Sequence, residues 1–248
     1  MDKKTWIIIG AIVAIFAGVI ATSILQNQSN TNYDQYDLAT IIDANDDSGN
    51  LAENIDGDPN APVIIYEYGD YQCTACAPIN PYINEIIEEY DGKVAVVLRT
   101  YIMDYHQNGT AAASAANAAA IQGYWKPFKD IIYSKQNDWY YSEGTERQKQ
   151  FEEYFMTASN NQGDLEKFRT DMSSKAVAKK ISFDRALSTR ANVDWTPTFY
   201  LGDELIDQRG MSTSDFLKLL REKINKKLTE QGIEVPKKAK DNANKSDK

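Results

Sequence analysis

The amino-acid sequence predicts an α/β fold in which a helical insertion interrupts one sheet, preceded by a single membrane-spanning segment. Three observations predict the folded part. A β-α-β pattern covers residues 63–98, an alanine-rich helical block follows it, and a β-β-α pattern comes last. Neither flank alone has enough strands to close a core, so we expect both flanks to contribute to one sheet.

The N-terminus predicts a membrane anchor. Two lysines precede the uncharged apolar run WIIIGAIVAIFAGVIATSIL, residues 6–25. About 20 such residues cross a bilayer as a helix, and the run is longer than the apolar core of a cleaved signal. We therefore expect residues 1–25 to form a cytoplasmic start and an uncleaved transmembrane helix. Cleavage near Ala21-Thr22-Ser23 is the alternative.

The distribution of basic residues predicts the orientation of this anchor. After Lys4 the next Lys or Arg is Lys93, and the intervening stretch is acidic. Positive charge near a membrane-spanning helix stays on the cytoplasmic side. We expect a single-pass protein of the cell membrane with a cytoplasmic N-terminus and an extracytoplasmic folded part.

The regions that flank the predicted fold are polar. Residues 26–60 are acidic and show little periodicity, which predicts a flexible linker. Within them DANDDSGNLAEN approaches a calcium loop, but Ser48 replaces its glycine and Asn54 its glutamate, so a linker is favoured. Residues 232–248 predict a disordered, Lys-rich tail. The net charge of −9 argues against a nucleic-acid partner.

Residues 61–102 predict the first part of the sheet. The run VIIYEY, residues 63–68, is typical of a buried strand, and VAVVL, residues 94–98, of a second one. Between them, residues 75–90 place isoleucines at helical spacing. Pro78 fits the first turn of this helix, whereas Pro81 is expected to kink it. The segment is a β-α-β unit with two cysteines at its strand-to-helix turn.

Residues 103–192 predict the insertion and residues 193–231 the second part of the sheet. The alanine-rich stretch 110–125 has high helix propensity. Further helices are predicted at 124–137, 145–159, 164–173 and 175–191. Strands are predicted at 196–201 and 205–207, and a last helix after Ser212 as its N-cap.

Cys73 and Cys76 are the two cysteines of the chain, and three kinds of site use such a pair. A disulfide across two residues closes a very small loop and stabilises little. A zinc site needs four ligands, and the chain adds one histidine, His106, so a second chain would have to complete it. A redox pair is favoured, because C-x-x-C beside a β-α-β pattern is its usual context.

The spacing assigns a role to each sulfur. Cys73 lies where a helix begins, and unpaired amides with the helix dipole stabilise a thiolate there, which predicts the nucleophile. Cys76, one turn later, lies within bonding reach and resolves a mixed disulfide. Thr74 and Ala75 between them are expected to tune the thiolate. We expect no metal and no cofactor other than the Cys73–Cys76 disulfide.

From about residue 58 to residue 230 the chain resembles the DsbA-like branch of the thioredoxin superfamily. The resemblance rests on DPNAPVIIYEYGDYQCTAC, on the helical insertion, and on TPTFYLGDELI. It implies a thioredoxin fold with an inserted helical domain, in a membrane-anchored member of the family. It also implies that Pro197 is the cis-proline whose loop faces the cysteines, and that Thr196 contacts the thiolate and the substrate.

Glu67 precedes Cys73 by six residues, among apolar neighbours where an unpartnered carboxylate is costly. The resemblance implies that it handles the proton of the resolving cysteine. The alternative is a glutamate on a partly exposed strand face. Thr74-Ala75 departs from the family's better-known oxidases, which have a histidine between the cysteines. We expect His106 to be a helix-start or loop residue.

These features predict an extracytoplasmic thiol–disulfide oxidoreductase that introduces disulfides into unfolded exported proteins. The resemblance implies reoxidation by a quinone-linked membrane partner of the DsbB or vitamin K epoxide reductase type. A reductase or isomerase that uses the same pair is the first alternative. A non-catalytic surface interaction protein with a thioredoxin-like body is the second.

Overall fold

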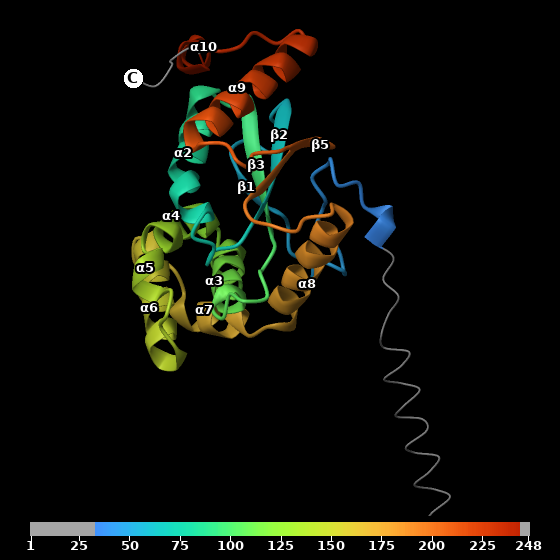
Figure 1. The fold of residues 1–248 in the computed structure, drawn as a ribbon. Coiled ribbons are helices and arrows are strands. Elements are labelled where there is room, and N and C mark those ends of the chain that lie inside the picture. The colour runs from blue at the N-terminus through green and yellow to red at the C-terminus, as the bar shows by residue number, and fades with distance from the viewer. Residues whose placement is uncertain (1–32, 244–248) are drawn as a thin grey trace, which may run out of the picture. The chain divides into compact units, whose positions relative to one another are not determined.

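The computed structural model describes residues 33–243 of the chain (Figure 1). The chain divides into two units, and the described part of the first unit is a short 3-10 helix, η1 (Tyr33–Gln35). The second unit begins at Tyr36 and contains the sheet and all the other described elements.

A five-stranded sheet of order β1-β3-β2-β4-β5 forms the centre of this second unit. Its strands are β1 (Asn54–Asp56), β2 (Val63–Gly69), β3 (Val94–Thr100), β4 (Thr198–Leu201) and β5 (Glu204–Ile206). Strands β2 and β3 pair in parallel, and the other three pairings are antiparallel. The sheet therefore joins segments from both sides of the insertion, which confirms the predicted α/β fold.

The helices follow the predicted segments closely. They are α2 (Cys76–Glu89), α3 (Gly109–Ile121), α4 (Trp125–Ser134), α5 (Gln136–Trp139), α6 (Gly144–Ala158), α7 (Leu165–Met172), α8 (Lys175–Arg190), α9 (Thr213–Glu230) and α10 (Lys237–Ala243). Ser212 caps α9 as predicted, because its Oγ accepts from the amide of Asp215 at 3.1 Å. Residues 124–137, predicted as one helix, form most of two, α4 and α5.

Two layers cover the sheet. On one face, isoleucines of α2 and the apolar side of α9 pack against Val63 and Ile65 of β2. On the other face, Tyr66 and Tyr68 pack with residues that follow α8 and with Leu38 and other residues that precede β1. Alternate residues of β2 therefore face two different cores, as strand geometry requires.

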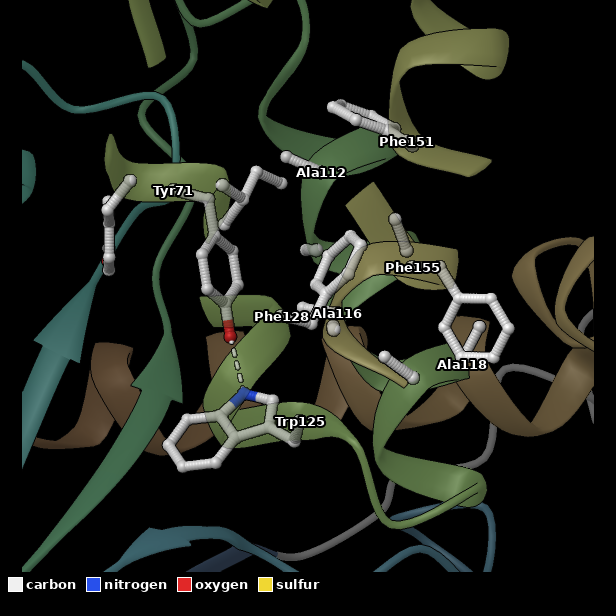
Figure 2. Packing of buried hydrophobic residues seen from close by; sticks show 14 of the residues in the cluster. Tyr71, Ala112, Ala116, Ala118, Trp125, Phe128, Phe151 and Phe155 are labelled. Atoms are coloured by element: carbon white, nitrogen blue, oxygen red, sulfur yellow. Dashed lines mark hydrogen bonds between the residues drawn. The ribbon is translucent and has the colours of Figure 1, made fainter. Parts of the chain in front are cut away.

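The insertion has its own core, centred on α3. Six alanines of this helix are fully buried, and their small side chains let the neighbouring helices approach closely. Figure 2 shows Phe128, Phe151 and Phe155 around these alanines. Tyr71, from the turn that carries the cysteines, joins this core and accepts a hydrogen bond from Trp125 Nε1 at 2.9 Å (Figure 2). The insertion is thereby packed onto the cysteine turn.

The prediction of a flexible linker is wrong for residues 36–60. Strand β1 extends the sheet at its edge, with Ile55 opposite Val97. Arg99 of β3 is fully buried, and its guanidinium donates to Glu53 Oε1 at 2.6 Å and to the carbonyl of Leu38 at 2.8 Å. A buried guanidinium needs such acceptors, and this acidic segment supplies them. Residues 26–32 lie outside the described residues.

The prediction of a disordered tail is wrong for residues 232–243. Val235 and Ala239 are buried in the core formed with α2 and α9. The side-chain amide of Asn242 in α10 donates to Glu89 Oε1 at 2.7 Å. Two apolar residues at helical spacing thus anchor a segment whose composition is otherwise polar. Residues 244–248 lie outside the described residues.

The predicted transmembrane segment, residues 6–25, also lies outside the described residues. Between residues 33 and 243, none of the helices combines the length and the apolar character needed to span a bilayer.

Candidate active site

The two cysteines lie in the turn that joins β2 to α2, as predicted. The carbonyl of Asp70 accepts the amide of Cys73 at 3.0 Å, and the carbonyl of Cys73 accepts the amide of Cys76 at 3.1 Å. The Asp70 carboxylate is fully buried and accepts from the amides of Gln72 and Met103 at 2.9 and 3.0 Å. The turn is therefore fixed by backbone hydrogen bonds and by one buried carboxylate.

Cys73 has the environment of a thiolate. Its pKa is lowered to about 6, first by the hydrogen bond from the Cys76 side chain, while burial opposes the shift. The Thr196 side chain and the backbone amides of Ala75 and Cys76 lower the pKa further. Both cysteines are free thiols in this structure. At neutral pH most of Cys73 is therefore ionised and nucleophilic.

Cys76 has the opposite environment. Its side chain is fully buried, and burial raises its pKa well above the usual value. The hydrogen bond to Cys73 and the charges of Cys73 and Glu67 raise it further. The thiol of Cys76 therefore keeps its proton at neutral pH and needs a base before it attacks a mixed disulfide.

Thr74 and Ala75, the residues between the cysteines, have exposed side chains. Ala75 acts on Cys73 through its backbone amide, which lowers the thiol's pKa. The stabilisation of the thiolate therefore comes from the backbone, the second cysteine and Thr196, without a histidine between the sulfurs.

The loop before β4 faces Cys73. The Thr196–Pro197 peptide bond is cis, in agreement with the resemblance. The Cys73 thiol lies 3.3 Å from the carbonyl oxygen of Thr196, to which it donates. The Thr196 hydroxyl is buried and has no hydrogen-bond partner among residues 33–243, and its effect on the pKa of Cys73 shows that it lies close to the sulfur. On ionisation of the thiol, this hydroxyl is available as a donor to the sulfur.

Glu67 is buried, so the alternative of a partly exposed strand face is excluded. The side chain is 6% exposed and lies on the same face of β2 as Ile65, with Leu98 and Phe199 as its neighbours across the sheet. Burial raises its pKa to about 7, while the charge of Lys129 opposes the rise. A carboxyl that titrates near neutrality is suited to accept and return a proton.

Lys129 and Asp56 also belong to the surroundings of Glu67, and the sequence analysis missed both. Lys129 of α4 is 3% exposed, and its Nζ lies 2.6 Å from Asp56 Oδ2 of β1. Both charges influence the pKa of Glu67, in opposite directions. A lysine one helical turn from Trp125, among core residues, was the available signal. Asp56 gave none, because its segment has the composition of a linker.

Two glutamines connect the cysteine turn to the insertion, and no local sequence pattern indicates either of them. Gln136 donates through Nε2 to the carbonyls of Tyr71 and Cys73 at 2.9 and 3.0 Å. Gln72 accepts the amide of Asn108 at 2.6 Å and donates to the carbonyl of Tyr140 at 2.9 Å. The insertion therefore holds the backbone of the reactive cysteine in place.

His106 lies in the loop between β3 and α3, in the position expected for a loop residue. Its Nδ1 is 2.6 Å from Asp70 Oδ2, and its ring packs edge-on against that of Tyr105, with the ring centroids 4.5 Å apart. It reaches the cysteine turn through Asp70 and supports the shape of that turn.

The ionisation of Cys73 can be measured from its rate of alkylation by iodoacetamide between pH 4 and pH 9. We expect a midpoint near pH 6 in the wild-type chain. Thr196→Val removes a hydrogen-bond donor to the thiolate, so the midpoint should rise by about one unit. Thr198→Val is the matched control, because the Thr198 hydroxyl donates to the Trp195 carbonyl instead. A wild-type midpoint near 8.5, or no shift in Thr196→Val, contradicts this assignment.

The raised pKa of Glu67 should make the free energy of unfolding depend on pH. Its folded-state pKa of about 7 lies above the ordinary value of 4.5, so the folded state binds the proton more tightly than the unfolded state does. The free energy of unfolding of the wild type should therefore fall, relative to that of Glu67→Gln, as pH rises through this window. Between pH 5 and pH 8 we expect a change of roughly 2–3 kcal/mol in urea unfolding.

Glu88→Gln, which replaces an exposed carboxyl of α2, controls for the loss of one negative charge. Wild-type and Glu67→Gln stabilities that run parallel from pH 5 to pH 8 would show that the Glu67 carboxyl titrates normally.

Comparison with known proteins places these features in a family. The sequence profile of the thioredoxin family matches residues 50–222. A probable disulfide bond formation protein D from Bacillus cereus is 24% identical over 204 residues, which are 80% of this chain and 87% of that protein. An Na(+)/H(+) antiporter, NhaA 3 of Salinispora tropica, is 28% identical over 149 residues. The matched segment spans 60% of this chain and 21% of the antiporter's length.

Solved structures show the same fold. The oxidised BdbD of Bacillus subtilis has a TM-score of 0.58 at 21% identity, covering 77% of this chain and 98% of that one. The alpha-DsbA1 of Wolbachia pipientis has a TM-score of 0.55 at 22% identity, covering 72% and 92%. With its cysteine turn and cis-proline in place, the chain belongs to the thioredoxin family and has the fold of the DsbA-like thiol–disulfide oxidoreductases.

Proposed function

We propose that the chain is a thiol–disulfide oxidoreductase that introduces disulfides into exported proteins. The observation that carries the proposal is the contrast between two neighbouring thiols. Cys73 has a pKa lowered to about 6, and Cys76 has a pKa raised well above its usual value, in a turn that faces a cis-proline loop. One sulfur is thereby a good leaving group, and the other keeps its proton.

The reaction follows from this contrast. A substrate thiolate attacks Cys73 Sγ of the oxidised pair, the Cys73–Cys76 bond breaks, and Cys76 leaves with the electron pair and takes a proton. A second substrate thiolate then attacks the substrate sulfur of the mixed disulfide. Cys73 leaves as a thiolate, which its hydrogen bonds stabilise, and the substrate gains a disulfide. The chain ends reduced, with two electrons taken from the substrate.

The direction of net transfer depends on the stability of the reduced form. A stabilised Cys73 thiolate favours the reduced pair, which makes the disulfide a better oxidant. The low pKa of Cys73 supports oxidation of substrates over the alternatives of reduction or isomerisation, which use the same residues. The Bacillus cereus relative, named for disulfide bond formation, supports the same direction.

The surroundings of Cys73 favour an unfolded polypeptide as substrate. Tyr141 and Tyr105 are 87% and 72% exposed. The ring centroids of Tyr140 and Tyr141 lie 4.6 Å apart, and the Tyr140 carbonyl accepts a hydrogen bond from Gln72, the residue before Cys73, at 2.9 Å, so these rings lie beside the cysteine turn. Burial, followed by the charges of Tyr141, Cys73 and Tyr105, raises the pKa of Tyr140. Exposed aromatic side chains bind apolar segments of unfolded chains, which folded proteins bury. A non-catalytic interaction protein would have no use for the two differently ionised thiols.

Location and regeneration complete the proposal. The apolar segment 6–25 would anchor the protein in the cell membrane, with the catalytic part outside the cytoplasm, where disulfides persist. The chain has two cysteines, both in the active pair, so another molecule must reoxidise them. A quinone-linked membrane protein of the DsbB or vitamin K epoxide reductase type would fill this role.

A transfer experiment tests the proposal. The oxidised full chain, in detergent, is mixed at pH 7 with an equimolar amount of reduced, unfolded ribonuclease, and thiols are counted after alkylation. We expect two thiols to disappear from the ribonuclease for each chain and to appear on Cys73 and Cys76. Cys73→Ser is the inactive control.

The other outcomes separate the alternatives. A reduced chain that opens the disulfides of native ribonuclease, with no transfer from the oxidised chain, would indicate a reductase. Reactivation of scrambled ribonuclease without net oxidation would indicate an isomerase. No exchange in either direction would indicate an interaction protein.

A further inference from the structure

Tyr133 is a buried tyrosine with no part in the reaction proposed for Cys73, Cys76 and Glu67. It lies on α4 and is 3% exposed, and its ring packs against that of Tyr71, with the ring centroids 5.4 Å apart. Its hydroxyl is buried and has no hydrogen-bond partner in the described part of the chain. Such a group costs folding free energy, so phenylalanine would be the better residue for packing alone.

The hydroxyl borders the same small space as the Glu67 carboxyl. A Cβ built on Gly69 would lie 3.1 Å from Glu67 Oε1 and 3.5 Å from the Tyr133 hydroxyl oxygen. The space between the two oxygens is therefore open because residue 69 has no side chain. Lys129, one helical turn before Tyr133, approaches Glu67 from the same helix.

The electrostatics place Tyr133 beside the resolving cysteine as well. After burial, the charge of Cys76 is the largest influence that raises the pKa of Tyr133, followed by the charge of Glu67. Tyr133 and Cys76 also belong to one cluster of buried residues. The hydroxyl thus lies next to the two groups between which the proposed reaction moves a proton.

We infer that Tyr133 is a positioning residue for proton exchange between Cys76 and Glu67, and that its hydroxyl donates to the Glu67 carboxylate directly or through one water. The inference rests on the proposed function. When substrate attacks Cys73, Cys76 leaves as a thiolate and takes the proton of the neutral Glu67. The resulting carboxylate is stabilised by the Tyr133 hydroxyl and by Lys129. In the reverse direction the same carboxylate removes the proton of Cys76.

Glutathione disulfide tests this step with the reduced full chain by stopped flow. The Cys73 thiolate attacks one sulfur of glutathione disulfide, forms a mixed disulfide and releases one glutathione. Cys76 gives its proton to Glu67, attacks Cys73 Sγ and releases the second glutathione. The first phase depends on the concentration of glutathione disulfide and the second does not, so the two rates can be measured separately from pH 5 to pH 9.

For Tyr133→Phe we expect the second phase to be about tenfold slower at pH 7, and the first phase to be unchanged within a factor of two. The variant lacks a donor to the carboxylate, so the pKa of Glu67 rises and the pH midpoint of the second phase moves upward. Other titratable groups around Glu67 also bear on this midpoint. The charges of Lys129, Cys73 and Asp56 shift the pKa of Glu67. The charge of Glu67 in turn raises the pKa values of Tyr71, Cys76 and Tyr133.

Two further variants keep the test specific. Tyr66→Phe makes the same change at the residue next to Glu67, but on the opposite face of β2, and should leave both phases unchanged. Gly69→Ala places a methyl group between the two oxygens and should slow the second phase as Tyr133→Phe does.

The result that overturns the inference is a Tyr133→Phe chain whose second phase keeps its wild-type rate and midpoint. Equal slowing of both phases, which indicates a purely structural role, overturns it too. In either case the proposed function is still supported if the wild-type chain shows both phases and oxidises unfolded ribonuclease. A wild-type chain without either phase overturns the proposed function, and the inference falls with it.

Discussion

The hydrogen bond between the two active-site sulfurs is the interaction on which the rest of the site depends. It lowers the pKa of Cys73 more than any other contact does, and it raises that of Cys76. The bond exists because the end of β2 and the start of α2 place the sulfurs one turn apart, with Cys76 fully buried. Burial alone would raise both pKa values, so the contrast needs this geometry.

Parts of the chain outside the sheet's central strands maintain that geometry. Gln136 of the insertion holds the carbonyl of Cys73, and Lys129 of the insertion, with Asp56 of the edge strand, sets the charge around Glu67. Arg99 in turn fixes the segment before β1 by pairing with Glu53. The insertion and the N-terminal segment therefore act on the chemistry as well as on the fold.

The sequence predicted the fold and the central residues well, because their signals are local. Hydrophobic periodicity located most helices and four of the five strands, and the cysteine spacing located the turn. Strand β1 was missed because it is three residues long and lies in an acidic segment. Lys129 and Gln136 were missed because their partners are 73 and 63 residues away, and local patterns carry no information about such contacts.

The most direct test of the account is the reduction potential of the Cys73–Cys76 pair in the full chain, measured against glutathione from pH 5 to pH 9. Above about pH 6 reduction should take up one proton, so the potential should fall by about 30 mV per pH unit, with a steeper slope of about 60 mV below pH 6. At pH 7 it should be clearly less negative than about −270 mV, the value of thioredoxin. A slope of about 60 mV up to pH 8, with a potential near or below that of thioredoxin, would contradict a thiolate-stabilised oxidant.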